Sequence, residues 1–121
     1  MSAVTFLWIL FLASGALLMG ISIPLIRGRV GQNPWYGFRV RRTLEDPKVW
    51  YAVNAYSGRR LFGAGVAEAV VATALYWLAD LDVAVYASIV GAVAIGGLAF
   101  GLIQSFRYLR QWTKEEAAPT G

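Results

Sequence analysis

Residues 83–106 read VAVYASIVGAVAIGGLAFGLIQSF and contain no Asp, Glu, Lys or Arg. A helix needs about 20 apolar residues to cross a hydrocarbon core roughly 30 Å thick, and this stretch is long enough. Two other stretches are also long and nearly free of charge. Met1 to Ile26 has no charged side chain, and Leu61 to Ala79 has only Glu68. The sequence therefore predicts three transmembrane helices, at about residues 4–26, 61–79 and 83–106.

The composition agrees with a membrane protein. Of the 121 residues, 58% are hydrophobic and 15% are charged, whereas soluble domains are usually about 45–50% apolar. We expect one all-α integral membrane domain over residues 1–121. We also expect no enzymatic activity, cofactor or metal site, because the chain has no Cys and no His, which supply common nucleophiles, bases and metal ligands. The first stretch is expected to be a permanent helix, since no basic residue precedes it and its apolar run is longer than that of a signal peptide.

The basic residues predict the orientation. Eight Lys and Arg lie in the first connection, residues 27–60, and three lie in the tail, residues 107–121, while the turn at residues 80–82 has none. By the positive-inside rule, we expect the loop and the C-terminus in the cytoplasm and the N-terminus outside, in a bacterial inner membrane. The net charge of +4 is then a topology signal, with the arginines near anionic lipid headgroups, and we expect no nucleic-acid binding.

Aromatic residues flank the predicted spans at both ends. Trp and Tyr are enriched at membrane interfaces, which predicts that these residues are interface anchors. The residues concerned are Tyr76, Trp77, Tyr86, Tyr108 and Trp112.

Small residues recur at helical spacing in two spans, and such residues allow transmembrane helices to approach closely. The third span has Ala84, Ser88, Ala92 and Gly96, followed by the GxxxG pair Gly97 and Gly101, and the second has Gly65, Ala69 and Thr73. An antiparallel pair of the second and third spans would use both series. A remaining small-residue face would serve a homodimer, and both interpretations stay open.

Glu68 is the one acidic residue within a predicted span. A charge at the membrane centre costs about 2.5–3.5 kcal/mol on insertion scales. We therefore expect a neutral carboxyl group hydrogen-bonded to Ser14, Ser22 or Gln104, or a pair with an arginine from the loop. The alternative is a proton or cation pathway.

The loop at residues 27–60 carries signals of local structure. Asn33-Pro34 and Tyr36-Gly37 predict turns, and Asp46-Pro47 is typical of a helix N-cap followed by the first helical residue. We expect a short amphipathic helix after it that runs into the second span, with a bend at Ser57-Gly58. Its Trp and Tyr residues indicate a structured loop, folded against the membrane or the bundle.

The loop also resembles a known family. The runs that carry the resemblance are PLIRGRV (24–30), NPWYGFR (33–39), TLED (43–46) and VWYAVNAYSGR (49–59). Together they are similar to the signature of the SdpI family of bacterial membrane proteins, named for an immunity protein against a secreted killing peptide. The chain departs from the common pattern at Gly31-Gln32, where the family has two prolines, and at Val40, where it has threonine.

The resemblance implies a multi-pass protein that protects its host from a membrane-active peptide toxin. It also implies a signalling role, because the founding member is described as holding a cytoplasmic repressor at the membrane when toxin is present. The residues that match the motif are the candidate site for binding a partner or lipid, with fold formation as the alternative role. They are Asn33, Tyr36, Gly37, Arg39, Thr43, Asp46, Trp50, Asn54 and Arg59. Two other functions remain open: a small transporter or ion-conducting oligomer that uses Glu68, and an accessory subunit of a membrane complex.

Overall fold

The structure, a computed structural model, describes residues 1–117, with side chains described as far as Trp112. The described part of the chain contains no strand. It has four helices, α1 (Ala3–Ile26), α2 (Arg41–Glu45), α3 (Pro47–Leu78) and α4 (Val83–Ala117). α1, α3 and α4 are each long and apolar enough to cross a membrane. The prediction of an all-α membrane protein with three transmembrane helices is confirmed.

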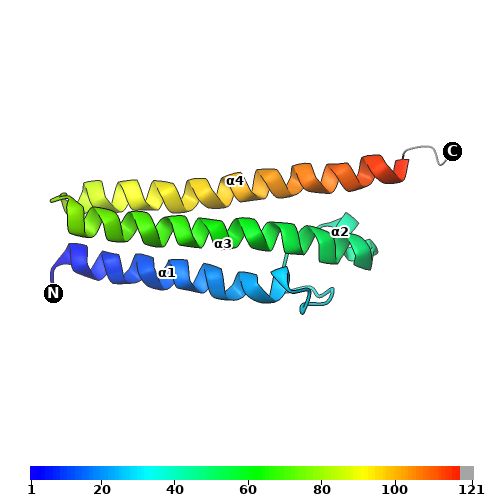
Figure 1. Cartoon of the computed structure of the whole chain (residues 1–121), viewed down its shortest axis with the longest axis horizontal. Helices are drawn as coiled ribbons and strands as arrows, with labels where there is room; N and C mark the ends of the chain where they lie inside the picture. Colours follow the sequence, from blue (N-terminus) through cyan, green and yellow to red (C-terminus); the bar gives the residue numbers. More distant parts are fainter. Residues whose placement is uncertain (118–121) are drawn as a thin grey trace.

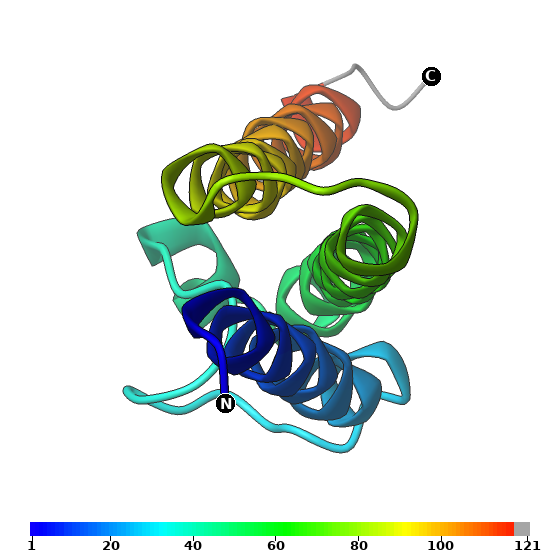
Figure 2. The ribbon, with the colours of Figure 1, turned by 90° about the vertical axis from the view of Figure 1, so that its left-hand side faces the viewer.

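The three long helices lie side by side, with α3 between α1 and α4 (Figure 1). The N-terminus and the turn that holds Asp80 and Asp82 lie at one end, which we call the acidic end. The loop after α1, with α2, lies at the opposite end, which we call the basic end. Figure 2 views the bundle from the acidic end. All the basic side chains that the structure describes belong to the half of the bundle that carries the loop.

Glycines bring α1 and α3 into close contact. A Cβ atom built on Gly65 would lie 2.6 Å from the backbone oxygen of Gly15, and one on Gly15 would lie 2.7 Å from that of Gly65. Further along the same face, the Trp8 indole donates to the Thr73 hydroxyl at 3.1 Å. The small residues of the second span therefore pack on α1, and the prediction that they pack on the third span is wrong.

The GxxxG pair brings α4 against α3. A Cβ atom on Gly97 would lie 3.2 Å from the Cβ of Ala64, and one on Gly101 would lie 3.2 Å from the Cβ of Arg60. The other small-residue series of α4 faces away from α3, so the prediction that it takes part in this pairing is wrong. Its members, all exposed, are Ala84, Ser88, Ala92 and Gly96.

Tyr86 anchors a small core at the acidic end. Its ring is fully buried together with Ala72 and Val90, and its hydroxyl donates to the backbone oxygen of Ala72 at 2.9 Å. Tyr86 is therefore a buried packing residue, and the prediction that it is an anchor exposed to the membrane interface is wrong. The Tyr86 hydroxyl, which could bond water or headgroups at an interface, instead has a backbone carbonyl of α3 as its hydrogen-bond partner. Trp77, by contrast, is 68% exposed.

The boundary between loop and helix differs from the expected one. Asp46 caps α3 as predicted, because its side chain accepts from the amide of Lys48 at 3.0 Å and Pro47 follows as the first helical residue. α3 then continues without a break to Leu78, so the expected bend at Ser57-Gly58 is wrong. A Cβ on Gly58 would lie 3.1 Å from the Ser22 oxygen of α1, so this glycine permits close packing of the two helices.

The segment after the third predicted span is helical as far as Ala117. α4 therefore includes much of the expected tail. Lys114, of the basic residues assigned to that tail, falls beyond the described side chains, and residues 118–121 fall beyond the described chain.

Candidate functional site

The loop at the basic end has a core of its own. Trp50 is fully buried, and its indole donates to the backbone oxygen of Val30 at 2.7 Å. The neighbouring side chains at the start of α3 are also buried, as is Thr43 of α2. We call these residues the loop core: Thr43, Val49, Trp50, Val53 and Asn54. A loop with such a core is a fixed structure rather than a linker.

Asn33 forms the first turn of the loop. Its Oδ1 accepts from the amides of Trp35 at 2.9 Å and Tyr36 at 2.7 Å. Its Nδ2 donates to the backbone oxygens of Gly31 at 2.8 Å and Tyr36 at 3.0 Å. Both donors and the acceptor of the amide are thus used to hold the backbone, which is the turn-forming role that asparagine commonly has.

Residues 36–38 connect all three long helices. The hydroxyl of Tyr36 donates to the backbone oxygen of Ile21 in α1. The ring of Phe38 meets the ring of Phe106 in α4 edge to face, with 5.0 Å between centroids. The amide of Phe38 donates to Oδ1 of Asn54 in α3 at 2.6 Å. Burial raises the pKa of the Tyr36 phenol, which is above neutral pH even in water, so the hydroxyl is protonated and able to donate.

Asn54 and Gly37 fit against each other at the centre of this connection. Asn54 is 1% exposed, and its Nδ2 donates to the backbone oxygen of Trp50 at 2.9 Å. Gly37 has φ +118°, and a Cβ there would lie 2.7 Å from Oδ1 of Asn54 and 3.1 Å from the Trp50 ring. Both the backbone angle and the space therefore require glycine.

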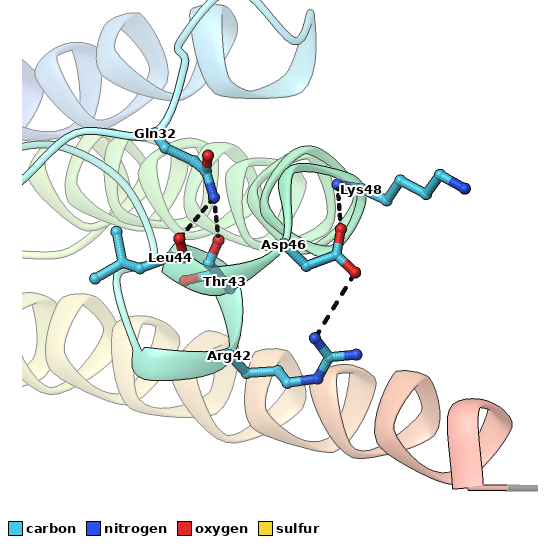
Figure 3. A network of polar contacts seen from close by, with 6 residues as sticks. All are labelled: Gln32, Arg42, Thr43, Leu44, Asp46 and Lys48. Carbon is cyan, nitrogen blue, oxygen red and sulfur yellow. Dashed lines mark hydrogen bonds and ion pairs between the residues drawn. The ribbon is translucent and has the colours of Figure 1, made fainter.

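Thr43 and Gln32 hold α2 against the rest of the loop (Figure 3). The Thr43 hydroxyl accepts from the amide of Val40 at 3.0 Å and lies 2.9 Å from the backbone oxygen of Phe38, to which it donates. Nε2 of Gln32 donates to the backbone oxygens of Thr43 and Leu44, each at 2.9 Å. Sequence reasoning missed Gln32, because its two acceptors lie far along the chain and nothing in its own neighbourhood signals them.

Asp46 joins α2 to α3. Besides capping α3, its carboxylate lies 3.8 Å from Nη1 of Arg42 (Figure 3). On the outer side of α2, Arg41 forms an exposed ion pair with Glu45 at 2.8 Å. The hydrogen bond and charge of Glu45 raise the pKa of Arg41, but such an exposed pair contributes little to stability.

The predicted site residues therefore fall into two groups. Those that build the loop are Asn33, Tyr36, Gly37, Thr43, Asp46, Trp50 and Asn54. Arg39 and Arg59 are exposed, and Arg39 donates to the backbone oxygen of Pro34. Trp35, with 86% of its surface exposed, adds an aromatic ring to this accessible set. Tryptophan and arginine are both residue types enriched at the centres of protein interfaces.

Glu68 lies away from the loop, between α1 and α3. It is 2% exposed, and the Ser14 hydroxyl donates to its Oε2 at 3.4 Å. Ser14 is one of the partners expected from the sequence. Ser22, another of them, instead donates to the backbone oxygen of Met19 at 2.7 Å. The carboxyl group of Glu68 thus helps to join two spans.

Comparison with known proteins identifies the family of the chain. A family model described as the SdpI/YfhL protein family matches residues 29–105, which is well over half of the chain. The matched region contains the loop core, all of α3 and most of the membrane-spanning part of α4. None of the curated proteins and none of the solved structures matches the chain.

Proposed function

Because this chain belongs to the SdpI/YfhL protein family, as its loop motif predicted, we propose that it is an immunity protein that protects a bacterial cell from a membrane-active peptide toxin. The observation that carries the proposal is the folded loop. The motif residues give it a fixed shape, and they leave Trp35, Arg39 and Arg59 accessible to a partner. We also propose that the protein has no catalytic role.

The proposed orientation places the basic end in the cytoplasm of a bacterial inner membrane. It is supported by the position of all described Lys and Arg side chains in the half of the bundle that carries the loop. A toxin that arrives from outside then meets the acidic end and the sides of the helices first. The loop faces the cytoplasm, where it binds anionic lipids and a repressor-type protein and so reports the toxin.

The orientation is tested by labelling, which the absence of cysteine makes simple. Single cysteines are placed at Trp35 in the loop and at Asp82 in the turn, both exposed positions, and intact cells are treated with a membrane-impermeant thiol reagent. We expect labelling at position 82 only. Labelling at position 35 only would show the opposite orientation, in which the loop is exposed outside the cell as a candidate receptor.

The immunity function is tested by survival. Cells that carry the chain or an empty vector are challenged with a panel of purified membrane-active peptides, and we expect the chain to protect against at least one. The double variant R39A/R59A should insert normally but lose protection, because it removes exposed guanidinium groups without touching the loop core. R107A/R110A is the matched control, since these arginines are also exposed but lie on α4 outside the motif. No protection by the inserted wild-type chain against any peptide would contradict the proposal.

The alternative function, ion conduction through Glu68, has less support. Glu68 is buried against Ser14, and it is the one charged residue between Arg60 and Asp80. A proton relay needs successive titratable groups, and none of the described α1 residues within the membrane is charged.

A further inference from the structure

α1 and α4 enclose a groove at the basic end. Near the acidic end the two helices meet, where the rings of Phe11 and Tyr86 lie 6.1 Å apart between centroids. Toward the loop they separate, and a groove of about 370 Å³ opens over α3. Residues 36–38 form its end wall. Its long sides come from Ile21 and Leu25 of α1 and from Leu98 and Leu102 of α4, with Leu61 of α3 between them.

The hydroxyl groups on the groove walls are already used within the protein. Ser105 donates to the backbone oxygen of Gly101 at 2.7 Å, and Ser57 donates to that of Asn54 at 3.4 Å. Tyr36 donates to Ile21. A water cluster or a polar ligand needs several polar partners, which these hydroxyl groups do not offer. The volume is in the range of small-molecule sites, roughly 300–1,000 Å³, and the walls suit a hydrocarbon chain.

The groove has a positive charge, which favours an occupant with a negatively charged group at one end. Arg60 is the charged residue among those that line the groove. It is exposed, and its guanidinium donates to the hydroxyl of Tyr56 at 3.1 and 3.3 Å. A guanidinium has five N–H donors, so it retains donors for a second acceptor. Arg39, also exposed, directly follows the end wall.

The position of the groove along the bundle also fits an occupant that is apolar at one end and anionic at the other. Ile21 and Leu25 belong to the last turns of α1, which ends at Ile26, directly before Arg27 and Arg29. The groove therefore lies where acyl chains meet the headgroups. Its apolar sides face the acyl region, and its basic residue lies at the level of the phosphates.

We propose that this groove is a binding site for one anionic phospholipid, with an acyl chain between α1 and α4 and the phosphate at Arg60. The loop contributes directly, because residues 36–38 line the groove at the basic end. This inference concerns a site separate from the exposed loop residues and does not depend on the immunity function. An apolar segment of a peptide is the competing occupant.

The site is tested on the purified full chain. The protein is reconstituted in an equimolar mixture of phosphatidylglycerol and phosphatidylcholine, extracted into detergent and analysed by native mass spectrometry. We expect one retained phospholipid per chain, predominantly phosphatidylglycerol. Leu102→Trp should abolish retention because the indole fills the groove. Ile103→Trp is the matched control, since Ile103 is 58% exposed and does not line the groove. Leu98→Trp, on the same wall, serves as a second blocking variant, and circular dichroism verifies folding.

A separate substitution tests the role of the Arg60 charge. Arg60→Gln should still retain a phospholipid but lower the preference for phosphatidylglycerol about fivefold, as expected for one basic residue near an anionic headgroup. Arg110→Gln, an exposed arginine of α4 outside the groove, should leave the preference unchanged. Equal retention by Leu102→Trp and Ile103→Trp would overturn the proposal. So would a wild-type chain that retains no phospholipid, or one that retains an added membrane-active peptide in its place.

Discussion

Replacing Asn54 by alanine should loosen the connection between the loop and the three long helices. The side chain of Asn54 accepts from the Phe38 amide at 2.6 Å and donates to the Trp50 oxygen at 2.9 Å. Alanine leaves the Phe38 amide without its acceptor. An unsatisfied donor costs about 1–3 kcal/mol, and a value of about 2 kcal/mol raises the local opening equilibrium roughly thirtyfold.

The assay is hydrogen exchange at the amide of residue 38 in detergent-solubilised protein. We expect exchange roughly thirtyfold faster in N54A than in the wild type, with amides in the middle of α3 unchanged. Ser57→Ala is the control, because Ser57 lies one turn further along the same helix and makes one long hydrogen bond, 3.4 Å, to the Asn54 oxygen. If N54A remained folded and its residue 38 amide exchanged at the wild-type rate, the assigned role of Asn54 would be refuted.

Three further variants test the packing of the spans by thermal unfolding in detergent. Gly65→Ala should destabilise the bundle by about 1–3 kcal/mol, because its Cβ would lie 2.6 Å from a backbone oxygen of α1, whereas Gly63→Ala, with no atom within 4 Å, should not destabilise it. Glu68→Gln should stay within about 1 kcal/mol of the wild type, because an amide oxygen can also accept from Ser14, and a larger loss would indicate a role for the carboxylate charge. Tyr86→Phe should cost about 1 kcal/mol, the contribution of the hydrogen bond from its hydroxyl to a carbonyl of α3, and an unchanged midpoint would argue against that bond.

The spans and the start of α3 could be predicted because they depend on local chemistry. A long run without charged residues can cross the hydrocarbon core as a helix, whatever its tertiary contacts. Asp46 and Pro47 act on backbone groups within a few residues of themselves. The family could be predicted for a similar reason, since its motif is a run of residue types within one loop.

The contacts between helices, by contrast, could not be predicted from the sequence. Gly65 and Gly97 are equally small, yet one faces α1 and the other α3, because a small residue permits close approach without selecting a neighbour. Tyr86 is predicted to be an interface anchor because it flanks the acidic turn at residues 80–82, but its hydroxyl donates to the Ala72 carbonyl, which lies in another helix. The hydrogen bonds of Gln32 likewise depend on a fold that its neighbours in the chain do not encode.

α3 has 32 residues, which at 1.5 Å per residue make a rod about 48 Å long, well beyond a hydrocarbon core of roughly 30 Å. Asn54 belongs to the loop core near one end of this rod, and Tyr76 stacks on Trp8 near the other, with ring centroids 4.3 Å apart. No joint separates them, since α3 is continuous. Because the two contacts are ends of one continuous helix, any tilt of α3 would move the loop core and the Trp8–Tyr76 stack together.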